Sequence, residues 1–225
     1  MIAFDKLPAE FRNDEVRRYY DMLQKRRGSL FVKRAFDIVA AVIILLFIII
    51  PIAVIAVMIR LDSKGPALFR QERVTTYGRR FRILKFRTMV VNAEQLGTMV
   101  TTDSDSRVTK LGRKLRKYRL DELPQIFNVL AGDMSFVGTR PEVVKYVRKY
   151  KPEYYATLLM PAGITSLTSI MYKDEEKLLA STDDADSVYL NKVLPEKMKY
   201  NLEYVENFSF FHDIGLMFKT VKEVF

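Results

Sequence analysis

The chain has 225 residues, which suits one compact domain with a terminal extension, and it carries a formal net charge of +10 from 37 basic and 27 acidic residues. This basic balance favours anionic partners, such as nucleic acid, anionic lipid or phosphorylated substrates. The lack of cysteine and the single histidine, His212, exclude disulfides, thiolate metal sites and histidine-rich zinc sites, so any catalysis depends on carboxylates, lysine, arginine, tyrosine or a hard cation such as Mg²⁺.

The first 30 residues are polar and mixed in charge. Asn13 is a typical N-cap for a helix that we expect to run to about residue 27, with Gly28 as its stop. Its apolar residues recur on one face, and they are Val16, Tyr20 and Leu23. We interpret residues 1–30 as an amphipathic extension, and we expect no cleavable signal peptide, because no small-residue cleavage site follows the later apolar run.

The segment of residues 38–59 contains no charge and no hydrogen-bonding side chain. Its length fits the roughly 20 residues that cross the hydrocarbon core of a bilayer. Buried helices of soluble domains seldom stay apolar on every face for so long. The sequence therefore predicts a membrane helix over residues 31–60.

Pro51 lies inside this apolar run, and proline kinks or breaks a helix because it lacks an amide donor and clashes with the preceding turn. Both flanks of the run are basic, which places both on the cytoplasmic side of a membrane. A helix that enters the membrane, bends near Pro51 and returns satisfies this charge pattern. An ordinary span remains open, since spanning helices tolerate proline.

Asp37 immediately precedes the apolar run, where a buried charge is expensive. Arg34 lies one helical turn earlier, so we expect the two to form a structural ion pair at the interface.

Residues 61–225 are predicted to form a catalytic domain on the cytoplasmic face of the membrane. Two short strands are expected around a turn at residues 75–78, a loop at 97–106, and an ambiguous segment at 161–194. Helices are expected at 107–118, 121–132, 142–150 and 212–225. The fold class is therefore α+β, predominantly helical with a small β-hairpin, in a monotopic membrane protein with a kinked re-entrant helix near its N-terminus.

Two adjacent carboxylates, Asp121 and Glu122, follow several cations and lie where a helix is expected to start. A helix N-terminus offers free amides and positive partial charge to a phosphate, and an aspartate there can attack phosphorus or hold Mg²⁺. The alternative is that Asp121 is only an N-cap and Glu122 a first-turn acid.

Three further cations are candidates for binding phosphate. Arg140 lies in the glycine-containing segment 132–141 and can grip a phosphate bidentately, although an ordinary turn there is the alternative. Lys85 and Arg87 alternate with Phe86 on a predicted strand and share one face. Most such pairs are merely solvated.

Taken together, these segments resemble the bacterial sugar transferase family, the small monotopic phosphoglycosyl transferases that act on polyprenol phosphate. The resemblance covers roughly residues 31–221, and its most specific part is the Asp-Glu-Leu-Pro-Gln run at 121–125 followed by Gly-Asp-Met-Ser-Phe-Val-Gly at 132–138. The other matching segments lie at 33–37, 65–74, 85–89 and 204–209.

The resemblance implies a reaction and a set of roles. Asp121 matches the aspartate that attacks the β-phosphate of a UDP-sugar, expels UMP and forms an aspartyl phosphosugar, and Glu122 matches its partner, which prepares the polyprenol phosphate. Mg²⁺ is expected beside Asp121 and the diphosphate. The remaining matches are basic positions near the phosphates, namely Lys85, Arg87 and Arg116, and a nucleotide-associated element, namely Arg140 and Pro141. The implied location is a bacterial inner membrane, in contact with its lipids.

The sequence departs from the family pattern at several positions. Thr139 replaces the proline before Arg140, Ile50 replaces the small polar residue before Pro51, and the segment 161–166 carries an extra alanine and a serine. We expect these changes to affect the nucleotide loop, the kink and substrate specificity. Which sugar is carried and whether the chain forms a homo-oligomer stay open.

Two other classes of protein remain as alternatives. A membrane-tethered nucleic-acid-binding protein is suggested by the charge and by the helix pair at 107–130, but the carboxylates in the turn of that pair would repel phosphates, so no nucleic acid is expected. The other alternative is a membrane scaffold without catalytic activity.

Overall fold

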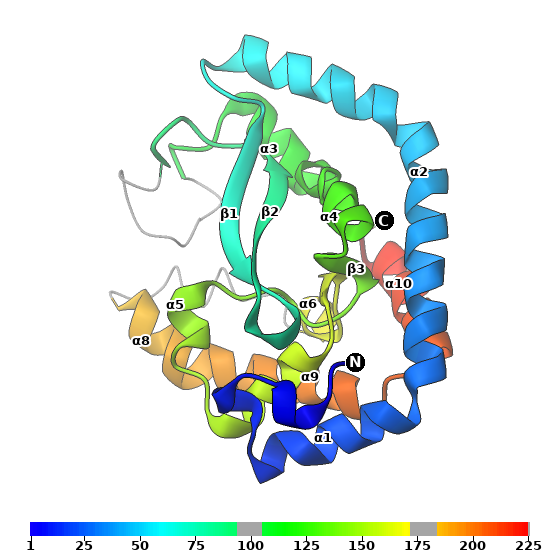
Figure 1. The fold of residues 1–225 in the computed structure, drawn as a ribbon. Coiled ribbons are helices and arrows are strands. Elements are labelled where there is room, and N and C mark those ends of the chain that lie inside the picture. Colours follow the sequence, from blue (N-terminus) through cyan, green and yellow to red (C-terminus); the bar gives the residue numbers. More distant parts are fainter. Residues whose placement is uncertain (94–104, 172–183, 225) are drawn as a thin grey trace.

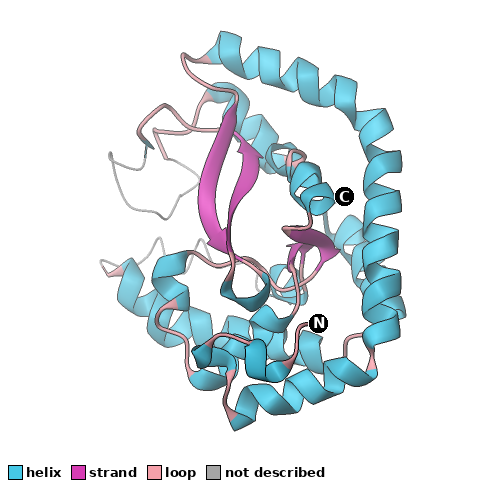
Figure 2. Ribbon diagram, in the orientation of Figure 1, coloured by secondary structure: helices cyan, strands magenta, loops and turns pink. Residues whose placement is uncertain are grey.

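The structure is a computed structural model and describes residues 1–93, 105–171 and 184–224. Helices surround a central β-hairpin, and a second, smaller pair of strands lies to the right of its lower end in the view of Figure 2. The confirmed part of the predicted fold class is this mostly helical composition with small sheets and one long apolar helix near the N-terminus. The loop predicted at 97–106 lies almost wholly outside the described residues.

The N-terminal helix forms as predicted. Two 3₁₀ turns, η1 (Phe4–Lys6) and η2 (Ala9–Phe11), precede α1 (Asp14–Lys25), and the Asn13 side chain caps α1 by accepting from the Val16 amide at 2.9 Å. The predicted stop at Gly28 is wrong. The break falls at Arg26, whose guanidinium donates to the Glu206 and Phe208 carbonyls, and Gly28 lies in the first turn of the next helix.

The next helix, α2 (Arg27–Asp62), contains Pro51 and bends as it passes along one side and over the top of the molecule in Figure 1. It is the one helix among the described residues that is long and apolar enough to cross a membrane, and only 11% of its most apolar stretch is buried against the rest of the protein. Only a narrow strip of α2 is buried against the rest of the protein. Its buried residues are Lys33, Asp37, Ala41, Ile52 and Ile59.

The polar residues at the start of α2 fasten it to the rest of the chain. Arg34 donates to the carbonyls of Val129 and Leu130 near the end of α4 (Gln125–Ala131), and Asp37 accepts from the Phe136 amide at 3.2 Å. The predicted Arg34–Asp37 ion pair is therefore wrong. A helix C-terminus attracts a cation and a free strand amide attracts a carboxylate, so both residues use tertiary partners.

The predicted hairpin is confirmed. Strands β1 (Leu68–Val74) and β2 (Arg80–Phe86) pair antiparallel from Leu68 opposite Phe86 to Val74 opposite Arg80, and the 3₁₀ turn η3 (Thr76–Gly78) connects them. Tyr77 and Gly78 both have positive φ there, which reverses the chain tightly. Strand β2 of the hairpin lies beside α4. It also contacts the 3₁₀ turn at Leu120–Glu122, which precedes this helix.

The middle of the chain alternates short helices and strands. After α3 (Lys110–Lys117) and the 3₁₀ turn η5 (Leu120–Glu122), α4 ends at Gly132, whose φ of 82° is the left-handed value typical of a helix stop. The helix predicted at 142–150 is shorter in the structure, where it is α5 (Val144–Val147). The other elements here are β3 (Met134–Val137), η6 (Pro152–Leu159), β4 (Ala162–Thr165) and α6 (Leu167–Met171).

The second sheet was not predicted from the sequence. Strands β3 and β4 pair in parallel, with Met134 opposite Ala162. Just beyond β3, the backbone at Gly138 comes very close to β4. A Cβ on Gly163 would lie only 2.2 Å from the Gly138 amide nitrogen. Only glycine fits such an approach, which explains the glycine in each segment.

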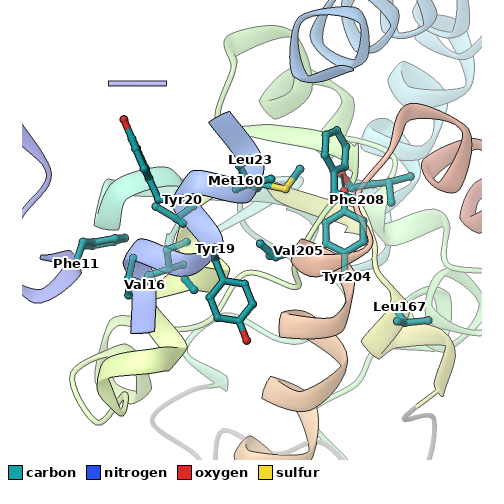
Figure 3. Packing of buried hydrophobic residues seen from close by; sticks show 14 of the residues in the cluster. Phe11, Val16, Tyr19, Tyr20, Leu23, Met160, Leu167, Tyr204, Val205 and Phe208 are labelled. Carbon is teal, nitrogen blue, oxygen red and sulfur yellow. Dashed lines mark hydrogen bonds between the residues drawn. The ribbon is translucent and has the colours of Figure 1, made fainter. Parts of the chain in front are cut away.

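The last part of the chain is helical. Helix α8 (Ala185–Val188) continues through a π-helical stretch, η7 (Tyr189–Val193), into α9 (Leu194–Glu206), and α10 (Phe210–Val224) follows. Figure 3 shows how side chains of α1 and α9 pack together in the largest apolar core, including Tyr19, Leu23 and Tyr204. Residues 1–30 thus share a core with the region that follows α2.

Candidate active site

The two predicted catalytic carboxylates, Asp121 and Glu122, lie in the 3₁₀ turn η5 and are half-buried. Arg119, just before this turn, has a φ of 53°, a costly conformation for a side-chain-bearing residue and one that clusters at functional sites. Helix α4 begins at Gln125, so the prediction that a helix starts at the carboxylates is wrong. The carboxylates owe their position to the left-handed turn and the 3₁₀ turn, a geometry without a sequence signal.

Lys85, which is predicted to bind phosphate, lies beside this carboxylate pair. It is near the end of β2, and its Nζ is 2.8 Å from Oε1 of Glu122. Asn128 of α4 holds the strand in place, because its side-chain amide donates to the Arg82 carbonyl and accepts from the Leu84 amide, both at 2.9 Å. This side chain takes the role of a neighbouring strand, so α4 sets the position of Lys85.

Burial and charge act differently on the two carboxyl groups. Burial raises the pKa of Asp121, and the positive charges of Lys85 and Arg116 only partly oppose this effect. Burial acts on Glu122 as well, but the charges of Lys85 and Arg140 outweigh it and hold the pKa of Glu122 below its usual value. The pKa values of these neighbouring carboxyl groups therefore shift in opposite directions, because burial prevails at Asp121 and the nearby cations prevail at Glu122.

The other two predicted cations near the carboxylates also lie within electrostatic reach of them. Arg116 belongs to the last turn of α3, directly before η5, and Arg140 follows β3. The guanidinium of Arg140 donates to the Ser169 hydroxyl at 3.3 Å, and the Ser169 and Ser166 hydroxyls share a hydrogen bond. Sequence reasoning missed Ser169, because it lies in the segment of ambiguous secondary structure.

Arg87 does not join the site. Its guanidinium is buried and donates to the carbonyls of Ile59, Ser63 and Lys64 and to the Ser63 hydroxyl, which closes the C-terminal end of α2. The predicted role of Arg87 in binding substrate assumed that it shares one face of the strand with Lys85. This assumption fails, because β2 ends at Phe86. Arg87 follows the last strand residue, and the free carbonyls at a helix end attract a cation strongly.

Pro141 is buried directly after Arg140 and restricts the backbone there. Its carbonyl accepts a hydrogen bond from Arg73 at 3.3 Å, which ties this loop to β1.

The carboxylates are the candidate Mg²⁺ ligands. Among the described residues, no three histidine, cysteine, aspartate or glutamate side chains gather into a group that could hold a metal by themselves. Mg²⁺ is usually bound through one or two carboxylates together with substrate phosphates and water. One carboxylate such as Asp121 is compatible with a site of that kind, in which substrate phosphates and water would supply the other ligands.

The comparisons with known proteins agree on one family. The model for the bacterial sugar transferase family matches residues 28–225. A UDP-N-acetylgalactosamine-undecaprenyl-phosphate N-acetylgalactosaminephosphotransferase of Aeromonas hydrophila is 39% identical over 198 residues, which cover 86% of this chain and 44% of that protein.

Two other relatives differ in the sugar that their names imply. The galactosyl transferase CpsE of Streptococcus agalactiae is 37% identical over 216 residues, covering 91% of this chain and 44% of that protein. The UDP-glucose:undecaprenyl-phosphate glucose-1-phosphate transferase of Escherichia coli is 36% identical over 193 residues, covering 84% of this chain and 39% of that protein. The chain spans less than half the length of each of these relatives.

Proposed function

The chain belongs to the bacterial sugar transferase family, and from that premise we propose that it transfers a sugar 1-phosphate from a UDP-sugar to polyprenol phosphate and releases UMP. The observation that carries the proposal is the carboxylate pair in η5, with Lys85, Arg116 and Arg140 within electrostatic reach of it. Three cations around two carboxylates suit the transfer of a phosphate between two anionic substrates.

The proposed chemistry has two steps. First, a carboxylate oxygen of Asp121 attacks the phosphorus that bears the sugar, and the phosphoanhydride bond breaks as UMP leaves with its electron pair. Second, an oxygen of the polyprenol phosphate attacks the same phosphorus, the acyl phosphate bond breaks, and Asp121 returns as a carboxylate. The covalent intermediate allows UMP to depart before the second anion arrives.

Lys85, Arg116 and Arg140 neutralise the donor diphosphate and the charge that develops in each step. The lowered pKa of Glu122 makes it a weak base, so we propose that it prepares the acceptor by orienting Lys85. When bound at Asp121, Mg²⁺ would further neutralise the diphosphate and ease the loss of UMP.

The proposed location is the cytoplasmic face of a bacterial inner membrane, with α2 inserted from that face and returning to it. Both ends of α2 are fastened to the region that holds the carboxylates, through Arg34 at one end and Arg87 at the other. A helix that crossed the membrane completely would place these ends on opposite sides. The basic flanks of α2 add about 1 kcal/mol per cation near anionic lipid.

The topology can be tested by labelling, because the sequence has no native cysteine. Single variants at two exposed positions on either side of α2, Glu10→Cys and Arg70→Cys, should react with an impermeant maleimide from the same face of sealed membranes. Reaction from opposite faces would establish an ordinary span.

The reaction is tested with the membrane-embedded chain, Mg²⁺, polyprenol phosphate and a panel of UDP-sugars. We expect UMP release with at least one donor, and Asp121→Asn should lower turnover by at least about 10³-fold, because its amide cannot serve as the nucleophile. Stalled wild-type enzyme should carry a phosphosugar on Asp121 in mass spectra. Undiminished turnover in Asp121→Asn would remove this residue as the nucleophile.

A further inference from the structure

Arg140 is the one partly exposed residue in an otherwise buried segment. The six other residues from 137 to 143 are all buried. Thr139 is fixed on both sides, because its hydroxyl donates to the Thr157 carbonyl at 3.1 Å and its carbonyl accepts from the Gly163 amide at 2.9 Å. The backbone of this segment is therefore held in place, and its one partly exposed side chain, Arg140, lies within electrostatic reach of Glu122.

A buried polar cluster holds the far side of the same segment. Glu142 is only 3% exposed, and its Oε1 accepts from the Tyr189 hydroxyl at 2.7 Å and from Lys197 Nζ at 2.8 Å. Lys197 Nζ also donates to the Tyr189 hydroxyl at 2.8 Å, so the three groups form a closed triangle. The nearby Lys197 charge lowers the pKa of Glu142 in spite of its burial.

These partners come from the C-terminal helices. Tyr189 begins the π-helical stretch η7, a geometry often found at functional sites, and Lys197 lies in the first turns of α9. One turn further along α9, Asn201 accepts from the Thr168 hydroxyl at 2.6 Å. Thr168 precedes Ser169, which accepts from Arg140. One face of α9 thus supports both the loop that carries Arg140 and the side chain that Arg140 contacts.

A buried ion pair is weak evidence for stability, since its desolvation cost offsets its attraction, but such groups can fix one conformation over others. Arg140 needs such fixing if it is to bind a diphosphate, because small errors in placement are costly in catalysis. We propose that Glu142, Tyr189 and Lys197 are positioning residues that hold Arg140 for the donor diphosphate. This inference rests on the function proposed above.

The test compares two tyrosine variants. Tyr189→Phe removes the hydroxyl that donates to Glu142, and Tyr19→Phe removes the hydroxyl of a tyrosine with similar overall exposure, which donates to Glu153 from α1. Both variants should lose some thermal stability, Tyr189→Phe the more, because its hydrogen bond is the more deeply buried of the two. Only Tyr189→Phe should raise the donor KM and the calorimetric Kd for the UDP-sugar, by about threefold to tenfold, as expected for the loss of one buried hydrogen bond.

A second background shows whether the effect passes through Arg140. Adding Tyr189→Phe to Arg140→Ala should change donor affinity no further, because the side chain that it positions is gone. The double variant Glu142→Gln and Lys197→Met, which removes both buried charges together, should weaken donor binding in the same Arg140-dependent way. These comparisons supply a readout that a purely structural role would not alter.

The proposal is overturned if Tyr189→Phe and Tyr19→Phe bind donor equally well, or if the effect of Tyr189→Phe persists without Arg140. Its failure is distinguishable from failure of the proposed reaction. Equal affinities in the two tyrosine variants of an enzyme that releases UMP would remove only the positioning role. Absence of UMP release by the wild type with every donor would remove the proposed reaction, while calorimetric binding would still decide the positioning role.

Discussion

Helices α1 and α2 follow one another with only Arg26 between them, yet they differ in what they bury and in what they expose. In α1 the buried residues are all apolar or aromatic: Val16, Tyr19, Tyr20 and Leu23. The first half of α2 buries Lys33 and Asp37, while Phe31 and Phe47 are 76% and 77% exposed. The buried side of α2 thus combines these two charged residues with the apolar Ala41, Ile52 and Ile59, while large apolar residues cover its exposed side.

This difference between the two helices indicates that their exposed faces have different surroundings. The outer face of α1 carries charges, as a helix in water does. The outer face of α2 exposes many large apolar residues between Val32 and Leu61, as a surface in contact with a membrane does, whereas Lys33 and Asp37 are buried with partners. Membrane insertion of α2 is therefore the simplest account of a pattern that α1 lacks.

The largest expected effect comes from the polar anchor of α2. Lys33 Nζ lies 2.5 Å from Oδ2 of Asp213 and donates to the Val137 carbonyl, and both side chains of this ion pair are 5% exposed. Lys33→Met should lower the free energy of unfolding by about 3–5 kcal/mol, because it leaves a buried carboxylate without its cation. Thermal unfolding in detergent micelles measures the loss.

A matched variant separates charge from packing in that experiment. Lys33→Met combined with Asp213→Asn removes both charges and should recover much of the lost stability. If the double variant is no more stable than Lys33→Met alone, the pair contributes through packing and the anchor has a different origin.

A smaller effect is expected on the outer face of α2. Phe47→Asp places a charge on the exposed apolar surface and should weaken membrane insertion by about 2.5–3.5 kcal/mol, if this position lies near the bilayer centre. The measurement is the fraction of protein that remains with membranes after washing with salt and carbonate. The control, Glu15→Gln on the exposed face of α1, should leave this fraction unchanged. Equal retention of both variants would contradict membrane insertion of α2.

Local patterns predicted local structure well. The Asn13 cap, the apolar face of α1, the apolar run of α2 and the hairpin at 68–86 all depend on residues close together in the chain, so the sequence alone is enough to find them. The pairing of β3 with β4 joins two four-residue strands far apart in the chain, and such short parallel strands have no local signature.

The candidate site shows the same difference between features that the local sequence predicts and features that depend on distant segments. The carboxylates, Lys85, Arg116 and Arg140 were identified from motifs, and the structure brings them together. Arg34, Asp37 and Arg87 were misassigned because their partners are backbone groups of distant elements. A charged side chain can be located in a sequence, but the carbonyl or amide that it meets appears only when the chain is folded.

The placement of Arg87 has a mechanical consequence. Gly65 makes room for its guanidinium, since a Cβ there would lie 2.3 Å from Nη1 of Arg87. Two residues earlier on the same chain segment, Lys85 touches Glu122. A tilt or shift of α2 would therefore pull on the same segment that carries Lys85, and the displacement would reach the carboxylate pair through the contact of Lys85 with Glu122.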